Sequence, residues 1–144
     1  MDNPQIPPAD PDAAPFFEGC REGVLRIQQC AETGRLIFPP RPMSPFAPHV
    51  APTWTTVSGR GTIWSFVVPH PPLLPPFQDL APYVVVAVAL DEDPCVRLIG
   101  NLVTGVGGPI NQLGAEAVTI GARVRAVFER IDDSVTLPRW VLER

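Results

Sequence analysis

The stretch of sequence that decides the fold reads W-T-T-V-S-G-R-G-T-I-W-S-F-V-V-P-H over residues 54–70 and P-Y-V-V-V-A-V-A-L over residues 82–90. Both runs are rich in β-branched and aromatic residues, which favour β-strands. We expect a first long strand over residues 53–69, and Gly59 and Gly61 near its start indicate a bulge or a sharp bend. A long strand that coils through a bend begins the closure of a small antiparallel barrel.

Three further strands are predicted downstream, over residues 95–103, 122–130 and 136–142. The second of these alternates between apolar and polar side chains, as half-buried strands do. The proline-rich or glycine-rich stretches between the strands are expected to be loops. Five strands of this kind predict a mainly β protein with a five-stranded OB-fold barrel over residues 53–144.

The chain ahead of the barrel is expected to begin with an arm and a helix. Residues 1–14 are proline-rich and carry few large apolar side chains, so they predict a flexible N-terminal arm. A short helix is predicted over residues 15–22, because Pro15 suits a first helical turn and Gly23 ends the helix.

A small β unit is expected between this helix and the barrel. Two short strands are predicted over residues 24–30 and 35–38, joined by a turn. The many prolines of residues 39–52 exclude both a helix and a central strand, so this segment is predicted to be an extended crossing. Residues 15–52 are therefore predicted to form one region, a helix followed by a small β unit, ahead of the barrel.

Composition excludes several classes of function. The chain has 144 residues, a net charge of −4 and no lysine, so all basic side chains are arginines. No lysine is present to form a Schiff base, and the acidic balance disfavours a surface that binds nucleic acid. The charged fraction is 18% beside 45% hydrophobic residues, which indicates either an apolar partner surface or a small domain diluted by proline.

The sequence is expected to belong to a cytoplasmic protein with reduced thiols. Its N-terminal residues are acidic and proline-rich, without the apolar region of a signal peptide. The apolar run at residues 83–90 is far too short to span a bilayer. The three cysteines, Cys20, Cys30 and Cys95, form no dense disulfide framework.

The candidates for catalysis are few. His70 follows the first barrel strand and can act as an acid or base on a substrate held by another subunit, or simply pack in its loop. The carboxylates of residues 91–93 are expected to be solvated in a turn. Ser58 and Ser65 lie outside any nucleophile elbow. We therefore expect no independent catalysis by this chain.

Other residues are predicted to bind a ligand or a partner. Leu73, Leu74 and Phe77 lie in a loop stiffened by prolines, which favours docking, although the same side chains can instead fold back on the barrel end. Arg41, Arg97 and Asn101 are further candidates because they are polar residues within otherwise apolar motifs, with solvation at a strand edge as the alternative. Arg60, within the string S-G-R-G, is a candidate for contact with a phosphate or a partner carboxylate.

Several stretches resemble the DUF35 family of acyl-CoA-associated OB-fold proteins. They include F-F-E-G-C-R-E-G-V-L-R-I-Q-Q-C from Phe16, S-G-R-G-T-I-W-S-F from Ser58, R-L-I-G-N-L from Arg97 and I-G-A-R-V-R-A-V-F-E from Ile120. Their order and spacing match over nearly everything after Pro15. The resemblance implies a short helix and a rubredoxin-like zinc ribbon ahead of the OB barrel.

The resemblance also implies that the zinc ribbon is degenerate here. Its two C-x-x-C knuckles fall on Cys30 with Thr33 and on Ser44 with Ala47, so one thiol remains where structural zinc needs four S or N donors. We therefore predict a metal-free remnant, although zinc supplies such folds with roughly 10–16 kcal/mol of binding free energy. Packing of Phe38, Met43 and Phe46 on the barrel or on a partner is expected to compensate. Gathering of Cys20, Cys30, His49 and Cys95 around a metal is the alternative, which their spacing does not support.

The function that the resemblance implies is that of an accessory subunit. It would bind a thiolase-fold or lipid-transfer-protein-like acyl-CoA enzyme, an aldolase or acyltransferase, and help to form the acyl-CoA site. Acyl-CoA is then the ligand of the complex, with no tightly bound cofactor and no zinc, and Arg60 can contact a CoA phosphate or a partner carboxylate. The alternatives are a free-standing acyl-CoA-binding OB module and a partner of a MaoC-type enoyl-CoA hydratase.

Overall fold

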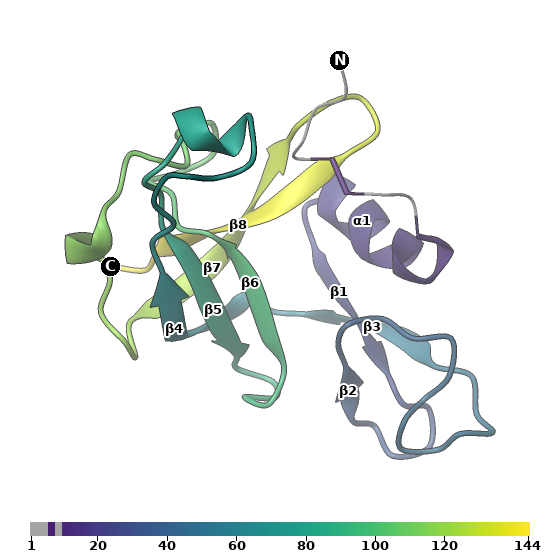
Figure 1. Ribbon diagram of the computed structural model, residues 1–144. Helices are drawn as coiled ribbons and strands as arrows, with labels where there is room; N and C mark the ends of the chain where they lie inside the picture. Colours follow the sequence, from purple (N-terminus) through teal and green to yellow (C-terminus); the bar gives the residue numbers. More distant parts are fainter. Residues whose placement is uncertain (1–5, 8–9) are drawn as a thin grey trace.

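The computed structural model describes residues 6–7 and 10–144 and shows two antiparallel sheets with one helix (Figure 1). The strand order is β2-β1-β3 in the smaller sheet and β6-β5-β4-β7-β8 in the larger one. The fold is therefore mainly β with an OB-fold domain, as the sequence predicted. Among the described residues, no helix has the length and apolar character needed to cross a membrane.

The N-terminal part forms helix α1 (Ala14–Arg21) after a short 3-10 turn, η1 (Pro11–Ala13). Asp10 caps this turn, since its Oδ1 accepts a hydrogen bond from the Asp12 amide over 2.9 Å. The predicted arm over residues 1–14 lies partly outside the described residues, and its last residues are helical. Helix α1 buries Phe16, Gly19 and Cys20 and contacts strands of both sheets, β1 and β8.

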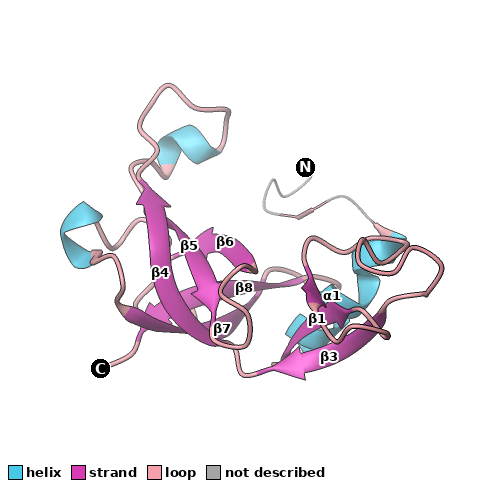
Figure 2. Cartoon of the chain, turned by 90° about the horizontal axis from the view of Figure 1, so that it is seen from below, coloured by secondary structure: helices cyan, strands magenta, loops and turns pink. Residues whose placement is uncertain are grey.

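The smaller sheet contains β1 (Leu25–Gln29), β2 (Leu36–Ile37) and β3 (Thr53–Val57). Strand β1 is central and pairs with both neighbours, so that Leu25 lies opposite Val57 and Gln29 lies opposite Leu36. Strands β1 and β2 match the predicted hairpin. Figure 2 shows this sheet beside the barrel, on the side where α1 lies.

The prediction of one strand over residues 53–69 was wrong, because this stretch forms two strands in different sheets. Strand β3 belongs to the smaller sheet and β4 (Arg60–Val67) to the barrel. The bend expected at the glycines is where the chain changes sheet. Gly59 has a φ of 74°, which favours glycine, and a Cβ on Gly61 would lie 2.2 Å from the Ala89 carbonyl oxygen. The domain boundary predicted at residue 53 stays a prediction.

The remaining barrel strands follow the predicted order. They are β5 (Val85–Leu90), β6 (Arg97–Asn101), β7 (Arg123–Arg130) and β8 (Thr136–Leu142). The connections contain two further 3-10 turns, η2 (Phe77–Asp79) and η3 (Ala115–Ala117). A parallel bridge between Leu102 and Trp140 brings the two edges of the sheet together, with the Val103 amide 2.8 Å from the Trp140 carbonyl oxygen. These contacts close the barrel.

The main core lies between the barrel sheet, helix α1 and the smaller sheet. Its fully buried side chains come from all three, so α1 and β1 contribute to the same core as the barrel strands. Examples are Cys20, Ile27, Val86, Leu102 and Trp140. A second cluster of Val103, Ile110, Val127 and Val141 fills the other end of the barrel, with Leu80 and Tyr83 packed on it.

Candidate functional site

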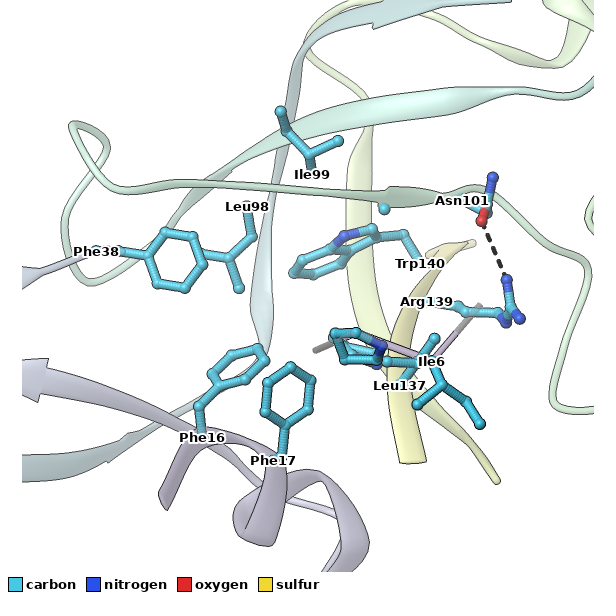
Figure 3. A pocket seen from close by; sticks show the side chains of 13 residues that line it. Ile6, Phe16, Phe17, Phe38, Leu98, Ile99, Asn101, Leu137, Arg139 and Trp140 are labelled. Atoms are coloured by element: carbon cyan, nitrogen blue, oxygen red, sulfur yellow. Dashed lines mark hydrogen bonds between the residues drawn. The ribbon is translucent and has the colours of Figure 1, made fainter. Parts of the chain in front are cut away.

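An apolar cavity of about 460 Å³ lies where helix α1 meets strands β6 and β8 (Figure 3). Its walls come from the N-terminal segment, the helix, the residue after β2 and the two barrel strands. The lining residues are Ile6, Pro7, Phe16, Phe17, Phe38, Leu98, Ile99, Gly100, Asn101, Leu137, Pro138, Arg139 and Trp140. A volume of this size lies within the range of small-molecule binding sites.

Aromatic side chains form one wall of the cavity. Phe16 and Phe17 follow each other on α1 with ring centroids 5.2 Å apart, and Phe38 lies 5.9 Å from Phe16. Figure 3 shows these rings facing Leu98 and Trp140 across the cavity. The indole of Trp140 lies against Gly100, because a Cβ there would come within 3.2 Å of the ring. The absence of a side chain at Gly100 therefore lets the indole of Trp140 approach β6 closely.

Asn101 and Arg139 form a hydrogen-bonded polar pair in the lining of the same cavity. Arg139 Nη1 donates a hydrogen bond to Asn101 Oδ1 over 3.1 Å (Figure 3). Asn101 Nδ2 donates to the Val84 carbonyl oxygen over 3.3 Å. Arg139 is only 6% exposed. Burial lowers the pKa of its guanidinium from the ordinary value, and the charge of Glu129 opposes this effect. The pair supplies hydrogen-bonding groups beside an otherwise apolar surface.

Of the predicted site residues, only Asn101 lines this cavity. Arg97 lies instead on the barrel surface, where its guanidinium carbon is 3.7 Å from the centroid of the Trp64 ring. Arg60 is exposed and forms an ion pair with Glu143 over 3.3 Å. The structure therefore does not bring these predicted residues together, and their roles in binding stay predictions.

Arg41 lies in the ribbon, beside a smaller cavity of about 160 Å³. The side chain of Gln28 holds the Arg41 backbone, accepting from its amide over 2.8 Å and donating to its carbonyl oxygen over 2.9 Å. Gln28 is buried, whereas the Arg41 side chain is exposed. The backbone of Arg41 is thus fixed, and its guanidinium faces solvent.

The proline-rich loop that contains His70 and Phe77 lies at the barrel end that holds the second core cluster. His70 is exposed, and Leu74 is 81% exposed. Leu73 and Phe77 are half-buried. The predicted interface residues therefore share one loop but differ in how much surface they offer.

The ribbon region does not offer the donors that a structural zinc ion requires. At the four knuckle positions the chain has one thiol, two hydroxyls and one methyl group, contributed by Cys30, Thr33, Ser44 and Ala47. Among the described residues, no group of three or more His, Cys, Asp or Glu side chains could hold a metal ion. The residues present therefore do not fit the metal that the fold family implies.

The three cysteines lie in different surroundings. Burial raises the pKa of the Cys20 thiol to about 12, and this residue belongs to the main core. Hydrogen bonds from Ser44 and Thr33 lower the pKa of the Cys30 thiol to about 7. Cys95 is exposed.

Sequence reasoning missed most of the cavity. The predicted helix contains Phe16 and Phe17 and the predicted last strand contains Arg139 and Trp140, but the sequence assigns none of the four to a site. One signal was available, since Arg139 is a charged residue between apolar neighbours in a strand with buried positions. Met43 and Phe46, which are expected to pack on the barrel or on a partner, are 52% and 38% exposed in the isolated chain, so their packing stays a prediction.

Comparison with protein families supports both parts of the fold. A family model described as the ChsH2 C-terminal OB-fold domain matches residues 54–129. A second model, described as the ChsH2 rubredoxin-like zinc ribbon domain, matches residues 17–43. The two matches follow the order of ribbon and barrel along the chain.

Two curated relatives are alpha subunits of hydratases. The chain is 35% identical over 138 residues to the 3-oxo-4,17-pregnadiene-20-carboxyl-CoA hydratase alpha subunit of Mycobacterium tuberculosis. It is 34% identical over 134 residues to a probable enoyl-CoA hydratase alpha subunit of Thermomonospora curvata. These alignments cover 94% and 92% of the chain but 38% of each relative, so the chain spans about two fifths of their length.

Two solved structures share the fold. A chain of an Ltp2-ChsH2(DUF35) aldolase superposes with a TM-score of 0.78 and 31% identity, covering 95% of this chain and 98% of that one. A DUF35 protein of unknown function from Sulfolobus solfataricus superposes with a TM-score of 0.58 and 13% identity, covering 94% and 87%. The second likeness shows the fold alone.

Proposed function

The chain belongs to the family of the ChsH2 C-terminal OB-fold domain, and from this premise we propose that it is an accessory subunit of an acyl-CoA enzyme. Its partner is a thiolase-fold aldolase or acyltransferase acting on the acyl-CoA of a lipid, a steroid side chain or a polyketide-like substrate. In this proposal the chain binds the partner and helps to form the acyl-CoA site.

The observation that carries this proposal is the likeness to the Ltp2-ChsH2(DUF35) aldolase chain. At 31% identity, the alignment covers nearly the whole of both chains. The region of this chain that aligns with the hydratase alpha subunits is therefore nearly the same region that aligns with the aldolase chain. This agreement favours an aldolase partner over a hydratase partner.

The cavity beside α1 gives the proposed role a physical basis. Its aromatic wall, formed by Phe16, Phe17 and Phe38, and the facing Trp140 suit an apolar group, since burial of apolar surface stabilises binding. We assign this cavity to the apolar part of the acyl group. The Asn101–Arg139 pair offers hydrogen bonds to a polar atom of the same ligand.

We further propose that this chain has no independent catalysis. In the described part of the chain, no serine or cysteine is hydrogen-bonded to a histidine, although activated nucleophiles commonly need such a base. His70 is exposed in its loop, and His49 is exposed in the ribbon. The reacting groups are thus assigned to the partner.

A second candidate function is support of an enoyl-CoA hydratase, such as a MaoC-type enzyme. The observation that favours it is that both curated relatives are named as hydratase alpha subunits. The two candidates share an acyl-CoA ligand and differ in the fold of the partner.

Identification of the partner distinguishes these functions. Tagged chain is purified from its native source, and the copurifying protein is identified, produced separately and mixed with the purified chain in size-exclusion chromatography with light scattering. A stable complex with a thiolase-fold protein is expected. A complex with a MaoC-type hydratase instead establishes the second candidate, and a chain that stays alone with either protein contradicts both.

A further inference from the structure

We propose that a hydrogen-bonded cluster around the Cys30 thiol replaces the zinc ion of the ribbon, on two loops that keep the shape of zinc knuckles. The inference concerns how the ribbon is held together and does not depend on the proposed function. It rests on the hydrogen bonds within each loop, on the burial of their side chains in one cluster, and on the contacts that join neighbouring segments of the ribbon.

The first loop retains a knuckle arrangement around Cys30. The amide of Thr33 donates to the Cys30 sulfur over 3.5 Å, and the amide of Gly34 donates to the Cys30 carbonyl oxygen over 2.8 Å. Gly34 has a φ of 75°, a conformation that favours glycine. The first and fourth residues of a C-x-x-C knuckle are the ligands, so Cys30 and Thr33 occupy ligand positions.

The second loop repeats this arrangement with oxygen in place of sulfur. Ser44 Oγ accepts hydrogen bonds from the amides of Phe46 and Ala47, over 3.1 and 3.3 Å. The side-chain atom of the first residue thus accepts from the amide of the fourth residue in both loops. Serine hydroxyls commonly stabilise turns in this way.

The four side chains at the knuckle positions meet at one place. The Cys30 sulfur accepts from the Thr33 amide, and the side chains of Ser44 and Thr33 lie near enough to lower the pKa of this thiol. The methyl group of Ala47 belongs to the same buried cluster as Cys30 and Ile37. Cys30 and Ser44 are each 1% exposed, so the centre of the ribbon is closed to solvent. A thiol, the Ser44 hydroxyl and a methyl group are therefore buried between the two loops, whereas Thr33 is exposed.

Other contacts supply the cross-links between segments that a metal ion would provide. Gln28 on β1 holds both backbone groups of Arg41. The guanidinium of Arg35, beside the first loop, lies 4.1 Å from the centroid of the Phe46 ring in the second. The hydroxyl of Thr53 donates to the Gln29 carbonyl oxygen over 3.3 Å. The Arg35–Phe46 contact thus joins the two loops, and the other contacts join β1 to the segments on either side of the second loop.

Restoring the missing thiols tests whether the loops remain shaped for a metal. The variant Thr33→Cys/Ser44→Cys/Ala47→Cys is expected to retain a stoichiometric amount of zinc after dialysis against a weak chelator, and to give the cobalt(II) spectrum of a tetrahedral thiolate site. The native chain, purified the same way, is expected to retain no zinc and to keep its melting temperature when a strong chelator is added. Thr33→Ser/Ala47→Ser is the matched control and should retain no metal.

A single substitution tests the cluster without any metal. Ser44→Ala removes the acceptor of two amides and a partner of Cys30, so we expect its melting temperature to fall by about 3–6 °C. Ser65→Ala, a half-buried serine on β4, is the control and should change little. The proposal is overturned if the triple variant, folded or unfolded, binds neither zinc nor cobalt. It is also overturned if the native chain needs zinc to keep its melting temperature, or if Ser44→Ala has the same melting temperature as the control.

Discussion

The ring of Phe77 packs against the ring of Tyr83, with centroids 6.4 Å apart and planes inclined at 48°. Tyr83 in turn packs on the second core cluster of the barrel. Phe77 therefore folds back onto the barrel end, whereas Leu74, three residues earlier in the same loop, is 81% exposed. The two side chains that the sequence predicted to dock together therefore have different surroundings. Substitution of Leu74 and of Phe77 is expected to affect different properties of the chain.

We predict that Leu74→Ala weakens the complex with the partner and leaves the isolated chain equally stable. An exposed anchor typically loses about 2 kcal/mol of binding free energy when truncated, which corresponds to a Kd at least tenfold higher. Phe77→Ala should instead lower the melting temperature of the isolated chain, because it removes packing on Tyr83. Calorimetric titration and thermal unfolding of both variants measure this. An unchanged Kd for Leu74→Ala contradicts the assignment of this loop to the interface.

Filling the cavity should impair use of the acyl-CoA substrate. Leu137→Trp places an indole in the cavity wall, so we expect the KM of the complex for a long acyl-CoA to rise at least about tenfold, which corresponds to about 1.4 kcal/mol. Ile120→Trp is the control, since Ile120 is exposed and lies outside the cavity lining. Steady-state kinetics with short and long acyl chains measure the effect. Equal KM values for the variant and the control contradict the assignment of the cavity.

The sheet change after β3 makes Gly61 a sensitive position. A Cβ at Gly61 would lie 2.2 Å from the Ala89 carbonyl oxygen, which is backbone and cannot move aside cheaply. We expect Gly61→Ala to lower the free energy of unfolding by at least about 2 kcal/mol in urea denaturation. Gly105→Ala is the matched control, because nothing lies within 4 Å of a Cβ there. Equal stability of the two variants would show that the β4–β5 pairing differs from the one described.

An ion pair beside the bend predicts a dependence of stability on pH. Arg123 donates from Nη1 and Nη2 to the two carboxylate oxygens of Asp91, each over 2.6 Å, and these hydrogen bonds hold the pKa of Asp91 below its ordinary value of 3.8. Because the folded-state pKa is depressed, this stabilisation is present above pH 3.8 and is lost as the pH falls through the folded-state value.

Asp91→Asn should therefore lower the urea midpoint near neutral pH and lose less stability than the native chain when the pH falls below 3.8. The exposed Glu32, in the turn after β1, supplies the control Glu32→Gln. Urea denaturation of all three proteins across this pH range measures the difference. Parallel curves for the native chain and Asp91→Asn would show that the pair contributes nothing to the pH dependence.

Much of the fold could be predicted because its signals are local. The run of residues 82–90, the glycines at the start of β4 and the alternation in residues 122–130 each mark a strand by composition and period. The helix was placed within one residue, since Pro15 and Gly23 mark its ends. Separation of residues 53–69 into β3 and β4 could not be predicted, because both pieces are β-rich and only their pairing partners differ.

The candidate site was harder to predict because its parts are distant in the sequence. Phe16 on α1, Leu98 on β6 and Trp140 on β8 meet only after the barrel has closed against the helix. Arg60 and Arg97 were predicted as ligand or interface residues from their motifs. On the surface, Arg60 pairs with Glu143 and Arg97 lies over the ring of Trp64. Asn101 was predicted because it is a polar residue within an apolar motif; it lines the cavity and bonds to Arg139, and its role in binding stays a prediction.

The most direct test of the central claim is acyl-CoA turnover by the purified partner, measured with and without an equal amount of this chain. The assay covers retro-aldol cleavage, thiolysis and hydration on a panel of acyl-CoA thioesters. We predict little or no turnover by this chain alone and a large gain in kcat/KM when it joins a thiolase-fold partner. Robust turnover by the chain alone, or a partner whose kcat/KM is the same in its presence and absence, would contradict the role of accessory subunit.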